Sequence, residues 1–274
     1  MQKLLNIEWL KLKHYTAFKV ISLFFVVGIF LTNYIVFSFN KNVIEANDTM
    51  KAVTGFSPYS FYNTWQTTSY ASGFLLIIPA LLLIIITTNE YSYKTSRQNI
   101  IDGMGRHEFI LTKLVMAIIV AIISTILVFL CALLFGLLSG TDFSSNHISH
   151  IGFFFLKALT YNLFAVLVSV LVKKTGFAIG LCFIYIGAEN ILSQMLDFAS
   201  MKLKLEGGPD LGAMGDYLPI NAADGLLTFP KNNITSIAKS AMPQDYTWVV
   251  FGFAIAYLIL FFWWSRRRFI NADL

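Results

Sequence analysis

The sequence predicts an all-α polytopic membrane protein with six transmembrane helices. Hydrophobic residues make up 57% of the 274 positions and charged residues only 13%, whereas a soluble domain carries about 25% charge. The apolar residues are gathered in several runs of roughly 20, the length that crosses the hydrocarbon core of a bilayer. One polar stretch, Asn89–Lys113, separates two of these runs. We therefore expect a single membrane domain spanning residues 1–274.

The first fifteen residues predict an interfacial helix. On a helical wheel, Trp9 and Leu12 fall on a broad apolar arc and Lys13 lies opposite. That arrangement suits a helix in the lipid headgroup layer. Glu8 falls within the apolar arc and is the one imperfection in the pattern. The alternative is a plain positively charged flank of the first span.

The apolar runs give the transmembrane helices and the polar segments between them. Pro79 lies inside the second span and should kink it, because proline removes one backbone hydrogen bond. The aromatic-rich segment 40–70 suits the bilayer interface. The outer segment 197–245 reads as an irregular loop by composition, and 211–229 is a candidate re-entrant piece. The six predicted spans are 20–39, 71–88, 114–138, 151–172, 177–196 and 247–264.

Lysine and arginine predict the orientation. Thirteen of the 20 lie at the N-terminus, in Asn89–Lys113, at the Lys173–Lys174 turn and at the C-terminus. Cytoplasmic segments are enriched in these residues, so both termini are predicted to be cytoplasmic. The net charge of +5 is accounted for by span ends, and we expect no nucleic-acid binding.

Asn89–Lys113 predicts a short amphipathic helix. Tyr93, Ile100 and Met104 share one helical face with Ile101, which predicts a helix over residues 91–101. Gly103 and Gly105 should end it. The alternative is an ordinary interfacial hairpin with no partner.

The same stretch resembles the first cytoplasmic loop in permease subunits of bacterial type-two ABC exporters. That family has a glutamate at the end of its second span, then a threonine, a helix and an R-x-E-x-x-x-x-K pattern. The family often has glycine before the threonine, where this chain has Lys94. The overall plan of interfacial helix, six spans and long outer segment is also similar. The residues that match the motif are Glu90, Thr95, Arg106, Glu108 and Lys113.

The resemblance implies that residues 91–101 form a cytoplasmic coupling helix that docks on a separate ABC ATPase. The chain would pair with a second permease, as a homo- or heterodimer, in the bacterial cytoplasmic membrane. It would export an amphipathic, lipid-like or peptide-like substrate. ATP and Mg²⁺ would bind the ATPase, and we expect no catalytic residue, metal or cofactor in this chain, which has no G-x-x-x-x-G-K-[ST] loop. The residues assigned to coupling are Glu90, Tyr93, Thr95, Arg97, Ile100, Ile101 and Arg106.

Two other classes of protein remain open at this stage. The chain could be a membrane scaffold or assembly subunit that moves no substrate. A secondary transporter is less favoured, because spans one to three and span six carry no central carboxylate or histidine for ion coupling.

Two charges fall inside predicted spans. Lys157 and Glu189 lie at similar depth in the fourth and fifth spans, so we expect them to interact, lining a substrate path or pairing structurally. Lys157 could instead extend to the outer surface. His147 and His150 lie three residues apart in an outer loop; they could bind a metal but are more often solvated in such positions.

Overall fold

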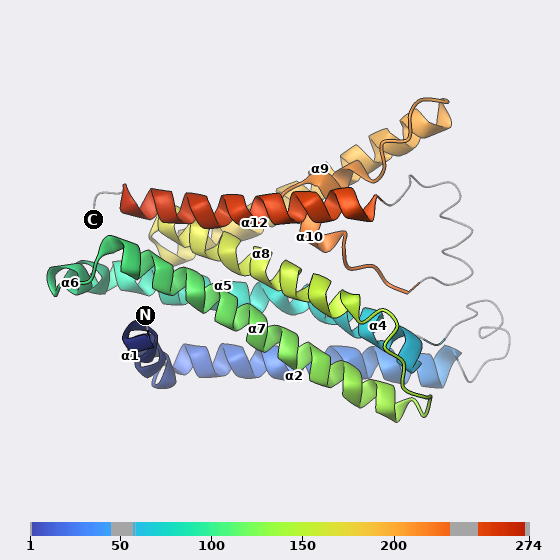
Figure 1. Cartoon of the computed structure of the whole chain (residues 1–274), viewed down its shortest axis with the longest axis horizontal. Helices are drawn as coiled ribbons and strands as arrows, with labels where there is room; N and C mark the ends of the chain where they lie inside the picture. The colour runs from blue at the N-terminus through green and yellow to red at the C-terminus, as the bar shows by residue number, and fades with distance from the viewer. Residues whose placement is uncertain (1, 45–56, 58, 231–245, 272–274) are drawn as a thin grey trace.

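The computed structural model covers the whole chain (Figure 1) and describes residues 2–44, 57, 59–230 and 246–271. Regular structure in these residues is helical. Six helical stretches within them are long and apolar enough to cross a membrane. The all-α, six-span prediction is therefore confirmed. Parts of the predicted 40–70 and 197–245 segments lie outside the described residues.

The six spans run roughly side by side (Figure 1). The start of α1, the last turn of the final span and α6 (Thr95–Ile101) lie at one end of the bundle, which we call the α6 end. The short helix α1 (Gln2–Lys13) precedes the first span at this end, as predicted. The spans are α2 (Thr16–Phe39), α4 with α5 (Phe61–Gly73 and Ile77–Ser92), α7 (Arg106–Leu138), α8 (Ser149–Val172), α9 (Thr175–Leu205) and α12 (Thr247–Ile270).

The helical stretch that holds the second span begins at Phe61, ahead of the predicted span start at Ala71. The aromatic side chains assigned to the bilayer interface are in part core residues: Tyr59, Phe61 and Trp65 are each 1% exposed. α4 is rich in serine, threonine and other polar residues, and its low hydropathy concealed it from a search for apolar runs. Trp65 donates its indole N–H to the Ser144 carbonyl at 2.8 Å, which satisfies the polar atom of a buried ring.

The kink predicted at Pro79 corresponds to an interruption in the helix. A 3₁₀ turn, Phe74–Leu76, separates α4 from α5. Proline has no N–H to donate to the carbonyl four residues earlier, which here is that of Leu75. The helical hydrogen-bond pattern is therefore interrupted just before the proline.

α8 is the central helix of the bundle. It packs against α4, α5, α7, α9 and α12. In its most apolar stretch of 18 residues, 78% of the residues are buried. The same share is 17% for each of α2, α9 and α12, whose exposed side chains are largely apolar. Apolar surfaces of this extent face lipid or another membrane protein.

α9 continues to Leu205, beyond the predicted end of the fifth span at Leu196. The chain then turns back along the bundle. It forms a 3₁₀ turn, Met214–Tyr217, and the short helix α10, Asn221–Asp224, which packs against α8, α9 and α12. Ile220, Ala222 and Leu226 are buried there. In place of the irregular loop expected from composition, this segment supplies part of the core.

Candidate functional site

The predicted helix 91–101 is split in two. α5 continues through Ser92, and Lys94 adopts a left-handed conformation with φ 56° before α6 begins at Thr95. The hydroxyl of Thr95 donates to the Glu90 carbonyl at 3.3 Å across this break. Tyr93 therefore does not belong to the same helix as Ile100 and Ile101. The continuous amphipathic face predicted from the spacing is wrong for this reason.

The two ends of the polar stretch agree with the prediction. α6 ends at Ile101, and Gly103 follows with a φ of 103°, a conformation open to glycine. α7 begins at Arg106, where the Gly105 N–H donates to a carboxylate oxygen of Glu108 at 3.1 Å. This contact stabilises the first turn of the third span.

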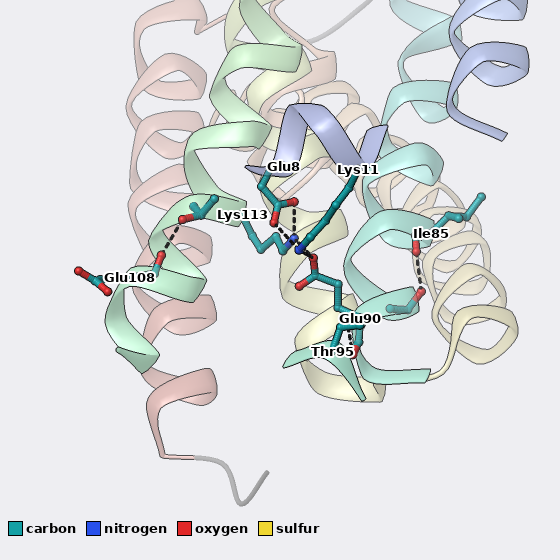
Figure 2. Close-up of polar contacts among 9 residues, drawn as sticks. Glu8, Lys11, Ile85, Glu90, Thr95, Glu108 and Lys113 are labelled. Atoms are coloured by element: carbon teal, nitrogen blue, oxygen red, sulfur yellow. Dashed lines mark hydrogen bonds and ion pairs between the residues drawn. The ribbon is translucent and has the colours of Figure 1, made fainter. Parts of the chain in front are cut away.

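Four charged side chains meet where α1, α5 and α7 come together (Figure 2). The ammonium group of Lys113 lies 2.7 Å from Glu8 and 2.8 Å from Glu90. The ammonium group of Lys11 lies 3.2 Å from Glu8 and 3.0 Å from Glu90. Two positive and two negative groups thus alternate in a neutral ring. We call Glu8, Lys11, Glu90 and Lys113 the charge ring.

Three of the four side chains of the charge ring are poorly solvated, whereas that of Lys11 is 39% exposed. The Lys113 side chain is 2% exposed and those of Glu8 and Glu90 are 7% exposed. Burial disfavours the charged form of Glu8, but the attraction of Lys113 and Lys11 outweighs it and lowers the pKa of Glu8 below its usual value. Burial likewise opposes the charge on Lys11, yet Glu90 and Glu8 raise its pKa. Glu8 and Lys11 are therefore held charged by their neighbours, and the ring ties α1 to two spans.

Sequence reasoning missed the ring although each signal was visible. Glu8 was the imperfection in the apolar arc of α1, and a buried carboxylate needs a cation or hydrogen-bond donors beside it. Glu90 and Lys113 were noted as matches to a family motif, and Glu90 also as a coupling residue, but neither was predicted to pair with Glu8. The connection needed the fold, because Glu8 and Lys113 are far apart in the sequence and meet only when α1 packs on α7.

The remaining residues assigned to coupling are not all at one surface. Tyr93 is 76% exposed and Ile101 is 83% exposed. Arg97, which lies between these two residues in the sequence, is also exposed. Ile100 is half-buried. The guanidinium of Arg106 donates to the Ile270 carbonyl at 3.1 Å and so ties α7 to the end of α12.

The predicted interaction between Lys157 and Glu189 is wrong. Lys157 lies 3.2 Å from the carboxylate of Asp224, which also accepts a 3.0 Å hydrogen bond from the Tyr161 hydroxyl. One oxygen of Glu189 instead accepts the backbone N–H groups of Ile220 and Asn221 at 2.6 and 2.8 Å. The segment around α10 inserts its own carboxylate and its own N–H groups at this level. Each membrane charge therefore has a separate partner.

The two outer-loop histidines contact each other. Their ring centroids are 5.7 Å apart, and Nδ1 of His150 lies 3.1 Å from the His147 carbonyl oxygen. Across the part of the chain that the structure describes, no group of three or more His, Cys, Asp or Glu side chains converges as metal ligands would. Cys131 and Cys182 are both buried free thiols.

The comparison with known families agrees with this architecture. The family model described as "ABC-2 family transporter protein" matches residues 4–189, which run from α1 through the first part of α9 and include the whole charge ring. No curated protein matches the chain. Because the match covers most of the chain, this protein belongs to the ABC-2 family of transporter membrane proteins.

Proposed function

We propose that the chain is the permease subunit of an ATP-driven exporter and that a separate ABC ATPase docks on the exposed surface of Tyr93, Arg97 and Ile101. The observation that carries this proposal is the combination of exposure and attachment. Tyr93 and Ile101 are large, largely apolar side chains that are exposed at the α6 end. Exposed apolar side chains beside an arginine are typical of the anchor residues of protein interfaces.

The attachment of α6 explains how such docking could move the membrane helices. Only Tyr93 and Lys94 separate α6 from α5, and residues 102–105 separate it from α7. The charge ring joins both spans to α1 close to these links. A displacement of α6 would therefore be passed to the second and third spans together.

The family membership supports a transport subunit that leaves ATP hydrolysis to a partner. The substrate, the direction of transport and the dimer partner are proposed from the composition of the chain and from its exposed apolar surface. α2 and α9 present long apolar faces, which fit lipid and the second permease of a homo- or heterodimer. We propose export of an amphipathic, lipid-like or peptide-like substrate across a bacterial cytoplasmic membrane, with both termini cytoplasmic. The alternative is a scaffold subunit that moves no substrate. The experiment described next also distinguishes this alternative from transport.

The test compares Ile101→Asp and Arg97→Glu with controls at the other end of the bundle. Leu205→Asp and Lys202→Glu place the same changes on exposed residues near the end of α9. We expect all four variants to reach the membrane. The two α6 variants should lose roughly tenfold or more of the co-purifying ATPase, because substitution of an interface anchor commonly costs 2 kcal/mol or more.

Two outcomes would contradict the proposal. If Ile101→Asp and Arg97→Glu retain the ATPase at the level of the controls, α6 is not the docking site. If the ATPase binds but no amphipathic compound changes its rate of hydrolysis in the reconstituted complex, the scaffold function is favoured over transport.

A further inference from the structure

The second span is interrupted where its two halves meet. α4 ends at Gly73 and α5 begins at Ile77, and Phe74–Leu76 forms a 3₁₀ turn between them. The third span, α7, is by contrast one continuous helix. A short 3₁₀ stretch within a longer helix often marks a functional hinge, because its hydrogen bonds have poorer geometry than those of an α-helix. We call residues 73–76 the span-2 break.

The two halves of the second span are held by different parts of the molecule. α4 lies toward the end of the bundle opposite α6 (Figure 1). There the side chain of Gln66 donates to the Thr228 carbonyl at 3.0 Å, and that of Asn33 on α2 donates to the Ser72 hydroxyl at 3.0 Å. α5 carries Glu90 of the charge ring and leads into α6. A displacement of α6 therefore acts on α5, while α4 stays tied to its own neighbours.

The span-2 break packs against a buried ion pair. A Cβ atom at Gly73 would lie 3.2 Å from Nζ of Lys157 and 3.2 Å from the Leu227 side chain, so glycine permits this close approach. The ammonium group of Lys157 lies 3.2 Å from the carboxylate of Asp224, the last residue of α10. It also lies 5.8 Å from the centre of the Phe74 ring. Lys157 thus contacts both the span-2 break and the end of α10.

Attachment of α10 does not by itself require charges at these positions. Buried ion pairs can often be replaced by apolar side chains of similar volume without loss of stability, and charged residues inside a bilayer are commonly functional. An ion pair differs from an apolar contact because it offsets the cost of desolvation only when its geometry is good. The pair of Lys157 and Asp224 is therefore suited to respond to a small change in the span-2 break.

We propose that the span-2 break is a hinge that carries a displacement of α6 along α5 to α10, and that Lys157 is the positioning residue that joins this hinge to α10. The proposal rests on the proposed docking at α6 for the source of the movement. Rotation of α5 about the break changes the contact of Gly73 and Phe74 with Lys157. The ion pair then passes the change to Asp224 and α10.

The experiment measures hydrogen exchange of the backbone amides of residues 214–227 in the full-length chain, in uncharged detergent and without an ATPase. Lys11→Met removes one of the two cations beside Glu90 and so loosens α5 at the α6 end. Because Lys11 is partly exposed, the fold should survive this change. We expect exchange in residues 214–227 to accelerate at least about twofold, the lower end of the coupling expected between distant sites.

Two second changes test the hinge and its link to α10. Pro79→Ala supplies an N–H that can donate to the Leu75 carbonyl and close the span-2 break, and Lys157→Met disconnects α10. In either background, Lys11→Met should no longer alter exchange in residues 214–227. Lys157→Met alone should accelerate this exchange because it loosens α10. A purely structural role for Lys157 would, however, leave the response to Lys11→Met intact.

Matched controls separate this route from general loosening. Lys202→Met removes an exposed lysine at the end of α9 and should leave exchange in residues 214–227 unchanged. Gly73→Ala places a methyl group against Lys157 and should weaken the response to Lys11→Met. Gly187→Ala adds the same group on α9, where no atom lies within 4 Å, and should keep the full response.

The hinge is overturned if Lys11→Met leaves exchange in residues 214–227 unchanged, or if its effect is the same in the unmodified, Pro79→Ala and Lys157→Met backgrounds. Equal effects would assign the movement to α9, where the Thr175 hydroxyl lies 2.8 Å from that of Thr88 on α5. Docking is judged separately, in the complex with the co-purifying ATPase. Exchange in residues 95–105 should change there when a non-hydrolysable ATP analogue replaces ADP. Absence of that change would contradict docking at α6 without altering the result for the hinge.

Discussion

The α6 end and the region around α10 both bury charged side chains, but they stabilise them in different ways. At the α6 end, the charge ring compensates two carboxylates with two ammonium groups, all from side chains. Around α10, Lys157 is paired with Asp224, while Glu189 is compensated by two backbone N–H groups. The first arrangement joins three helices that meet at one point. The second anchors a returning segment against spans that are already packed.

The difference indicates which contacts the fold depends on most. Lys113 touches both carboxylates of the charge ring and is 2% exposed, so no solvent can replace it. The Asp224 side chain is 25% exposed and keeps the Tyr161 hydroxyl if Lys157 is lost. Removing one member of a buried ion pair is costly because the other charge is left uncompensated. The two regions should therefore respond unequally to the same substitution.

The largest effect is expected from Lys113→Met. It leaves Glu8 and Glu90 with Lys11 as their shared cation, and the free energy of unfolding should fall by about 3–5 kcal/mol. Lys157→Met should cost about 1–2 kcal/mol, because Asp224 retains partial solvation and a hydrogen bond. Unfolding of the detergent-solubilised protein by a denaturing detergent measures both. Equal losses would mean that the charge ring is no more isolated from solvent than the Lys157 pair.

A smaller effect separates the partners of Lys157. In a double-mutant cycle, Lys157→Met and Asp224→Asn should show a coupling energy of about 1 kcal/mol, as expected for side chains in direct contact. Lys157→Met and Glu189→Gln should be additive within about 0.5 kcal/mol. A strong coupling between Lys157 and Glu189, with none to Asp224, would contradict the separate pairing seen in the structure.

Particular residues show why the sequence predicted the spans better than the contacts between them. Hydropathy follows from composition, so the apolar runs located all six spans. It failed for α4, where Phe61 and Trp65 alternate along the sequence with polar residues, while in the fold both rings are buried in an apolar cluster with Phe129. Lys157 and Glu189 were paired by depth alone, because nothing local showed that α10 returns between them. The break at Lys94 was equally hidden, since left-handed lysine is unusual.

The smallest effect concerns pH, and it tests whether the charge ring holds α1 in place. Because the pKa of Glu8 lies below its ordinary value of 4.5, its contribution to stability is complete above that value and is lost as pH falls through the lower pKa. Because the pKa of Lys11 lies above its ordinary value of 10.5, its contribution is complete below that value and is lost as pH rises further. Stability from both groups is therefore constant between these limits.

Glu8→Gln removes the part of the pH dependence of stability that comes from protonation of Glu8 in acid. The unfolding midpoint of the unmodified chain should decline more steeply below pH 4.5 than that of Glu8→Gln, and the two curves should run parallel near neutrality with the variant lower. Glu206→Gln changes an exposed glutamate at the end of α9 and should retain the slope of the unmodified chain. Other carboxylates also titrate in acid, so the informative quantity is the difference between the curves. If Glu8→Gln keeps the full acid slope, the carboxylate of Glu8 is not held by Lys113 and Lys11, and the attachment of α1 rests on its apolar contacts alone.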